Sequence, residues 1–190
     1  MHDDDARALI AAAIPAGDAA TRWADLGAGT GTFTRALSAL LGPRGHVHAV
    51  DRDPDAVAAL ARLARDDAMR SRAAVTVLRG DLADADLLRR LGGASLDGIL
   101  LANALHFVPA VEQPTVVARL VGWLRPGGRL VLVEYEERGP SRWVPAPVPF
   151  ARLAAIAPPD ASTPVRVGVR RSAYGGQLYA AFLTRAAASR

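Results

Sequence analysis

The residues best placed for chemistry form the run Asp25-Leu26-Gly27-Ala28-Gly29-Thr30-Gly31, which lies between a short apolar stretch and a segment with helical spacing. Glycines at alternate positions let the backbone turn sharply and approach a ligand within contact distance. The helix that follows would present unpaired amide groups and the positive end of its dipole. The run therefore predicts a loop that binds a nucleotide-containing cofactor.

The spacing of the glycines distinguishes two classes of cofactor. Loops for nicotinamide or flavin dinucleotides usually read G-x-G-x-x-G, with the pyrophosphate on the helix N-terminus. Here Thr32 stands where the third glycine would be, and Asp25 lies two positions before Gly27. A carboxylate at that place repels pyrophosphate and attracts the ammonium and sulfonium of S-adenosylmethionine (SAM). The spacing favours SAM over NAD.

A second acid follows at the distance expected for a ribose contact. Residues 46 to 50 form a short apolar stretch that ends at Asp51, twenty positions after Gly31. An acid there can accept hydrogen bonds from both ribose hydroxyls. Enzymes that use NAD have an acid in the same place, so Asp51 predicts a ribose-containing cofactor without distinguishing the two.

Three later segments continue this pattern. A β-branched strand over residues 74 to 79 leads to Gly80-Asp81-Leu82, and an apolar strand over residues 96 to 101 leads to Asn103. Residues 124 to 134 read as a helix end, a Pro-Gly-Gly turn and a buried strand. Taken in order over residues 23 to 135, the motifs resemble those of class I SAM-dependent methyltransferases of the small bacterial type.

The resemblance implies a fold and a set of cofactor contacts. The fold would be α/β: a Rossmann-like, doubly wound sheet of seven strands, mostly parallel, with an antiparallel strand in a C-terminal hairpin. The residues that would hold the methionine end, the ribose and the adenine, or border the sulfonium, are Asp25, Gly27, Ala28, Gly29, Gly31, Asp51, Arg52, Asp81, Leu82 and Asn103.

Methyl transfer from a sulfonium needs mainly alignment of the acceptor and exclusion of water, so a general base is optional. His106, three residues past Asn103, is the best candidate base because an imidazole titrates near neutral pH. Its alternative role is local capping or packing. Glu134 and Tyr135 could accept a proton or line the acceptor pocket, and Glu134 could instead satisfy backbone amides.

The acceptor is expected to be a small molecule. Asn103 lacks the Asn-Pro-Pro-Tyr context that holds a nucleobase amine, which lowers the case for such an acceptor. The pocket would come from the N-terminal helix, the loop after Asn103 and residues 136 to 160, and a second subunit in a homodimer could complete its cover. Arg166, Arg170 and Arg171 could bind an anionic acceptor or form a solvated face.

Composition narrows the class of protein. The 190 residues are 51% hydrophobic, which predicts one domain over residues 1–190, with a cofactor core at 1–135 and an acceptor side at 136–190. Cysteine and lysine are absent, which excludes a disulfide framework, a thiolate metal site and a lysine base. A net charge of +4 does not imply nucleic acid. The N-terminal segment is too short for a membrane span or signal peptide, which favours the cytoplasm.

Helices are expected where apolar residues have helical spacing, and strands where short apolar runs alternate with them. The expected helices cover residues 5–14, 32–41, 54–64, 83–91, 111–124 and 150–156. The expected strands cover residues 22–26, 46–50, 75–78, 96–101, 129–135, 165–170 and 177–184, with a turn at 173–176. The competing functions are an NAD(P)-linked reductase, a SAM-binding module without turnover, and a methyltransferase for RNA or protein.

Overall fold

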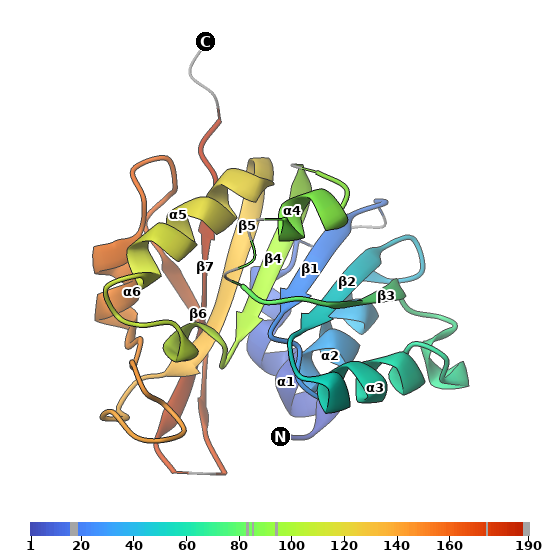
Figure 1. The fold of residues 1–190 in the computed structure, drawn as a ribbon, viewed down its shortest axis with the longest axis horizontal. Helices are drawn as coiled ribbons and strands as arrows, with labels where there is room; N and C mark the ends of the chain where they lie inside the picture. The colour runs from blue at the N-terminus through green and yellow to red at the C-terminus, as the bar shows by residue number, and fades with distance from the viewer. Residues whose placement is uncertain (16–18, 83, 85, 94, 174, 188–190) are drawn as a thin grey trace.

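The computed structural model describes residues 1–15, 19–82, 84, 86–93, 95–173 and 175–187. Over these residues the core is one sheet of seven strands in the order β3-β2-β1-β4-β5-β7-β6 (Figure 1). Neighbouring strands are parallel except β7, which is antiparallel to β5 and to β6. The doubly wound sheet and its antiparallel C-terminal strand are confirmed. The strands are β1 (Arg22–Leu26), β2 (His46–Asp51), β3 (Ala74–Arg79), β4 (Leu96–Ala102), β5 (Leu124–Tyr135), β6 (Val165–Arg171) and β7 (Gln177–Thr184).

Helices cover both faces of this sheet, and each face has its own apolar core. On one face α1 and α2 pack against the sheet, and on the other α4, α5 and α6 do so. Fully buried strands such as β4 therefore read as continuous apolar runs in the sequence. Every helix in the described ranges is too short or too polar to cross a bilayer. The helices are α1 (Asp3–Ile10), α2 (Thr32–Leu41), α3 (Pro54–Leu63), α4 (Leu87–Arg90), α5 (Gln113–Trp123) and α6 (Phe150–Ile156), with 3₁₀ turns at Ala11–Ala13, Asp67–Met69 and Leu105–Phe107.

Four of the described helices are shorter than the sequence pattern predicts, and two of them, α3 and α5, lose only one or two residues at an end. The first ends at Ile10 and continues as a 3₁₀ turn. The fourth is only Leu87–Arg90, because the Asp84 carboxylate accepts a hydrogen bond from the Asp86 amide at 2.9 Å and so competes with helix formation. Residues 83 and 85 of the expected helix, and residue 174 of the expected turn, lie outside the described residues.

The Pro-Gly-Gly turn lies inside β5 as a bulge and does not precede the strand. Leu124 already pairs with Leu96, and the next pair joins Arg129 to Gly98, so β5 carries extra residues between these two pairs. Gly127 has a φ of 77° there, a conformation that glycine adopts without a steric penalty. The strand therefore starts earlier than the expected residue 129.

We expect Gly98→Ala to destabilise the sheet. A Cβ at Gly98 of β4 would lie 2.2 Å from the ring of Trp23 on the adjacent strand β1. Trp23 is buried in the core, so its ring cannot move aside. Overpacking of this kind costs about 1–3 kcal/mol. Thermal unfolding should show a lower melting temperature than that of Gly122→Ala, where the new Cβ meets nothing within 4 Å. Equal melting temperatures for the two variants would contradict this account of the packing.

Candidate active site

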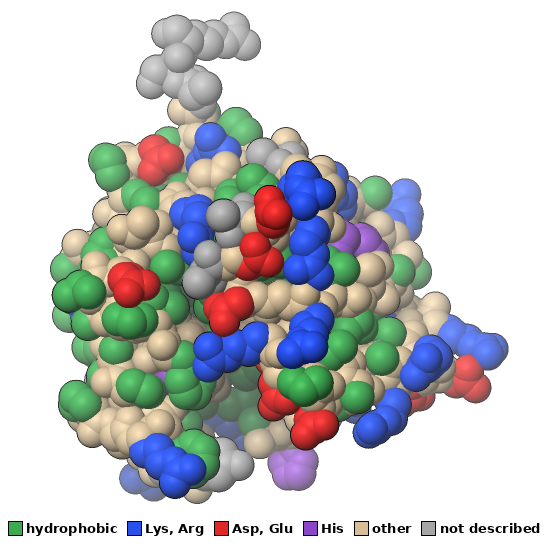
Figure 2. Space-filling view, in the orientation of Figure 1, with side chains coloured by type: hydrophobic (Ala, Val, Ile, Leu, Met, Phe, Trp, Pro, Cys, Tyr) green, Lys and Arg blue, Asp and Glu red, His purple; other side chains and the backbone are tan. Residues whose placement is uncertain are grey.

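A cavity of about 580 Å³ lies at the carboxyl ends of the parallel strands, close to where β1 adjoins β4. The chain order of the sheet reverses at this point, and ligands of open α/β sheets bind at such an edge. Figure 2 shows the surface hollowed near the lower centre, with hydrophobic side chains inside it and acidic side chains on its rim. The volume is within the roughly 300–1,000 Å³ typical of small-molecule sites.

The loop after β1 forms one wall of this cavity. Gly27 and Gly29 have φ values of 76° and 54°, and the amides of Gly27 and Ala28 both donate to the Val50 carbonyl. A Cβ at Gly27 would lie 2.7 Å from the Cβ of Ala104, whereas one at Gly29 would meet nothing within 4 Å. The loop is therefore fixed by packing at Gly27 and open to a ligand at Gly29.

Asp51 lines the cavity at the end of β2 and is held by two backbone amides. Its Oδ2 accepts a hydrogen bond from the Gly29 amide at 2.7 Å, and its Oδ1 accepts one from the Asp53 amide at 2.9 Å. Each carboxylate oxygen keeps a further lone pair. Asp51 can thus orient the glycine loop and still accept hydrogen bonds from the hydroxyl groups of a ligand.

A pair of charged residues borders the same end of the cavity. The guanidinium of Arg52 lies 3.3 Å from the Asp81 carboxylate, and Leu82 follows on the cavity wall. The Arg52 side chain is mostly exposed and the Asp81 side chain is partly exposed, so the pair adds little stability. The pair brings Arg52, Asp81 and the adjacent Leu82, three of the predicted cofactor residues, together at one region of the cavity.

Asp25 and Gly31 lie outside the residues that line the cavity. Asp25 is fully buried; its Oδ2 accepts a hydrogen bond from the Thr34 hydroxyl at 2.6 Å, and its Oδ1 has no partner among the described residues. Burial raises the pKa of Asp25 from 3.8 to about 7; the Thr34 hydrogen bond lowers it in part, and the charge of Asp51 raises it. Gly31 precedes α2 and packs toward Leu63.

We expect Asp25→Asn to remove a pH dependence from folding stability. The folded protein retains the Asp25 proton up to about pH 7, whereas the unfolded chain releases it near pH 4. Asp25 therefore lowers stability progressively between these pH values, by up to about 4 kcal/mol, and by a constant amount above them. Urea unfolding is measured from pH 4 to 8.5. The free energy of unfolding of Asp25→Asn, relative to that of the wild type, should rise up to about pH 7 and stay constant above it. A constant difference across this range would contradict the assignment.

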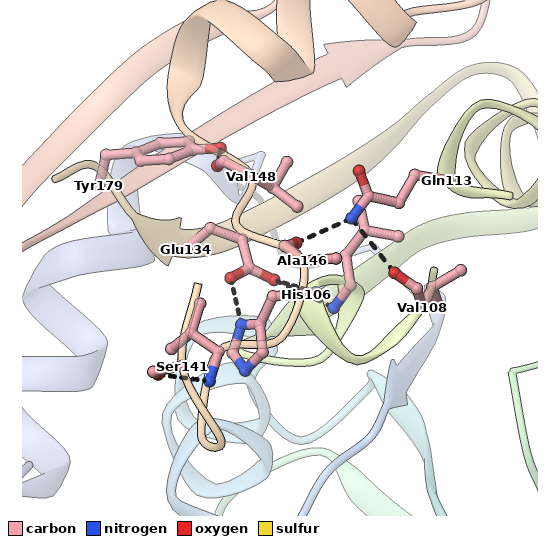
Figure 3. A network of polar contacts seen from close by, with 10 residues as sticks. His106, Val108, Gln113, Glu134, Ser141, Ala146, Val148 and Tyr179 are labelled. Atoms are coloured by element: carbon pink, nitrogen blue, oxygen red, sulfur yellow. Dashed lines mark hydrogen bonds and ion pairs between the residues drawn. The ribbon is translucent and has the colours of Figure 1, made fainter. Parts of the chain in front are cut away.

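His106 and Glu134 form a buried pair behind the cavity wall (Figure 3). The Nδ1 atom of His106 lies 2.6 Å from Oε2 of Glu134, and Oε1 accepts hydrogen bonds from the amides of Leu105 and His106 at 3.0 and 3.3 Å. Neither side chain is more than 2% exposed, and neither lines the cavity. The pair fixes the loop after β4 to the end of β5.

This fixed loop does reach the cavity. Asn103, Phe107 and Val108 line it, as does Tyr135, the residue after Glu134. Asn103 has a φ of 54°, and its buried Oδ1 finds no partner within the described part of the chain. Two of the predicted residues, Asn103 and Tyr135, therefore share the cavity with the glycine loop, while the His106–Glu134 pair supports them from behind.

A second contact network ties the same loop to the following segment. The buried side-chain amide of Gln113 donates hydrogen bonds to the backbone carbonyls of Val108 and Ala146 (Figure 3). The backbone amide of Ala146 in turn donates to the His106 carbonyl. Sequence reasoning missed Gln113, since a glutamine at the start of a helix carries no signal of this contact. Residues 141–148 thus pack beside the loop without entering the cavity.

One part of the cavity wall, called the far end below, is formed by Met1, His2, Asp5, Phe33 and residues 170–173, which are remote from one another in the sequence. Asp5 lines it from α1, as expected of the N-terminal helix, Met1 and His2 line it from the segment before that helix, and Phe33 lines it from α2. Residues 136–160, expected to border the acceptor, do not line this cavity, whereas residues 170–173, at and just after the end of β6, do.

Known proteins resemble this chain in sequence and in fold. Residues 24–130 match a family model described as a methyltransferase domain, and no curated protein sequence matches the chain. The fold is similar to that of an arsenic(III) SAM methyltransferase from Chlamydomonas reinhardtii, with a TM-score of 0.63 and 22% identity over 92% of this chain and 66% of that one. It is also similar to TrmN from Thermus thermophilus, with a TM-score of 0.64 and 22% identity over 95% and 48% of the two chains.

A third similar structure is magnesium protoporphyrin IX methyltransferase from Synechocystis PCC 6803 with bound SAM. Its TM-score is 0.69, with 18% identity over 97% of this chain and 78% of that one. The chain spans less than two thirds of the length of the first two structures. At these identities the likeness shows the fold.

Proposed function

Because residues 24–130 match its model, the chain belongs to the methyltransferase domain family, and from this premise we propose that it transfers a methyl group from SAM to a small-molecule acceptor. The observation that carries this proposal is the glycine loop, which is bound at 2.7 Å to the Asp51 carboxylate beside a cavity of about 580 Å³. An acid and a glycine loop in contact form a site for a ribose and the charged group attached to it.

The residues present fit this cofactor. The backbone around Gly29 is open to the methionine end, and the carboxylate of Asp51 has lone pairs for the ribose hydroxyls. Asp81 and Leu82, with Arg52 beside them, would hold the adenine. The unpartnered Oδ1 of Asn103 would accept a hydrogen bond from the cofactor's ammonium group. In this proposal Asp25 acts from behind the loop by holding α2 through Thr34.

The chemistry requires alignment more than proton transfer. When bound, SAM would supply an electrophilic methyl group. A lone pair of the acceptor would take this group while its bond to sulfur breaks and the electron pair stays on sulfur. Phe107, Val108 and Tyr135 line the cavity and would shield the reacting groups from water. Alignment of reactants can contribute roughly 7–11 kcal/mol. His106 and Glu134 position this wall, and a proton lost by the acceptor leaves through the open mouth of the cavity.

A small acceptor suits the size of the site. Once SAM is bound, a cavity of about 580 Å³ leaves room for a compact second ligand at the end lined by Phe33 and residues 170–173. We therefore assign the cofactor to residues 1–135, and the acceptor to the boundary between that part and residues 136–190. Two structures of similar fold are methyltransferases for arsenic(III) and magnesium protoporphyrin IX, which supports a small molecule of some kind as the acceptor.

Thermal unfolding with S-adenosylhomocysteine (SAH), SAM or NADH tests the cofactor. A ligand at 100 times its dissociation constant adds about 2.7 kcal/mol, which raises the melting temperature by roughly 5–10 °C in a chain of this length. Stabilisation by SAH and SAM but not by NADH is expected. Stabilisation by NADH alone would support a reductase, and no shift with any ligand would contradict the proposal.

Turnover needs a separate test, because a SAM-binding module would give the same thermal shift. The protein is incubated with SAM that carries a tritium-labelled methyl group and with a small-molecule extract of bacterial cells. Label in a small-molecule product, absent from the Asp51→Ala control, is the expected result. Tight SAH binding with no labelled product would support a binding module in place of an enzyme.

A further inference from the structure

We propose that the methyl acceptor is a small carboxylate with an aromatic or apolar body, and that Arg171 binds its carboxylate. This inference rests on the proposed function, since it names the substrate class of the same site. It comes from the pairing of charges around the far end of the cavity and from the apolar side chains that face the same space.

Two of the three arginines on β6 already have acidic partners. Arg166 contacts both carboxylate oxygens of Glu136 at 3.0 and 3.1 Å, and Arg170 lies 2.6 Å from the Asp5 carboxylate. Arg171, at the end of the strand, lines the cavity and forms no ion pair with any residue in the described ranges. The fold thus leaves one of these guanidinium groups available at the cavity.

The remaining arginine of the cavity is also occupied. Arg52 pairs with Asp81 at the cofactor end, and the other acid there, Asp51, is bound by two backbone amides. Of the arginines that line the cavity, Arg171 is therefore the one whose charge is not balanced by a described acid. A guanidinium in this state favours a planar carboxylate, to which it can donate two parallel hydrogen bonds.

Apolar side chains face the same space. Phe33, Phe107, Tyr135 and Leu178 line the cavity together with Arg171. Phe107 is 52% exposed although it is a large aromatic residue on the cavity wall. Covering such surface with an apolar ligand is favourable in proportion to the area buried. A ring or short hydrocarbon body with one carboxylate matches both features.

Binding of matched acids and amides tests the proposal. The probes are benzoate, phenylacetate and indole-3-acetate, each compared with its neutral amide by calorimetric titration of the SAH-saturated protein. We expect at least one acid to bind the wild type about tenfold more tightly than its amide. Arg171→Gln should abolish this preference by weakening the acid alone, and Arg171→Lys should retain part of it, because it keeps the charge and loses the planar fork.

The controls separate this inference from the cofactor assignment. Arg62→Gln removes an exposed arginine of α3 that is not among the cavity-lining residues and should bind all six probes as the wild type does. Three results would each overturn the inference. The wild type could bind acids and amides equally, it could bind SAH but none of the acids, or Arg171→Gln could keep the preference of the wild type for acids. Failure of the wild type to bind SAH would instead overturn the proposed function.

Discussion

The Asp51→Ala variant is expected to bind SAH about 100-fold or more weakly than the wild type. The substitution removes the acceptor for the ribose hydroxyls and releases the Gly29 amide, which the carboxylate holds at 2.7 Å. A hydrogen bond to a charged group contributes about 1.5–3 kcal/mol. Loss of the bonds from the two ribose hydroxyls to the carboxylate therefore corresponds to a loss of affinity of about 100-fold or more. Isothermal titration calorimetry with SAH measures it directly.

Two further variants make this result specific. Asp51→Asn keeps one acceptor oxygen and should fall between the wild type and the alanine variant. Asp67→Ala removes an exposed acid that pairs with Arg70, outside the cavity lining, and should retain the wild-type affinity. An Asp51→Ala protein that binds SAH as tightly as Asp67→Ala would rule out Asp51 as the ribose contact.

Glu134→Ala is expected to lower stability by about 3–5 kcal/mol, the cost of breaking a buried pair. The change leaves His106 Nδ1 and the amides of Leu105 and His106 without their acceptor. In a chain of this length the melting temperature should fall by about 6–20 °C, as measured by circular dichroism. Because Glu134 does not line the cavity, any loss of SAH affinity at low temperature must act indirectly, through the loop at residues 104–108 or through the neighbouring Tyr135.

The conservative variant separates a positioning role from a purely structural one. Glu134→Gln keeps an oxygen for the two amides and should recover part of the stability and most of the SAH affinity. If Glu134→Ala melts with the wild type, the His106–Glu134 pair does not hold the loop. If the alanine variant is destabilised but binds SAH normally at 15 °C, the pair stabilises the fold without positioning the site.

The order of elements could be predicted because the sheet is buried on both faces. Parallel strands covered by helices read as short apolar runs, and residues 46–50 and 96–101 lie within the observed β2 and β4. The local exceptions depend on side-chain and register details. The length of α4 depends on the Asp84 carboxylate, and the start of β5 depends on a pairing between Leu124 and Leu96 that no periodicity reports.

The candidate site could be predicted only to the level of which strand ends meet. Asp51, Asp81 and Asn103 share the cavity because the carboxyl ends of parallel strands converge at one edge. Glu134 and Tyr135 are neighbours on β5, and since successive side chains of a strand point to opposite faces, only one of them reaches the cavity. Met1 and His2 reach it through the packing of distant segments, which the sequence motifs do not encode. The same packing decides that Arg170 and Arg171 line the cavity while Arg166, named with them from the sequence, does not.

A crystal structure of the protein with SAH tests the central claim most directly. We predict that the ribose hydroxyls contact the Asp51 carboxylate and that the methionine end lies on the backbone of residues 27–29. The adenine should lie beside Asp81 and Leu82, with the sulfur facing the end lined by Tyr135. SAH bound outside this cavity, or with its ribose away from Asp51, would contradict the assignment of this edge of the sheet as the methyl-transfer site.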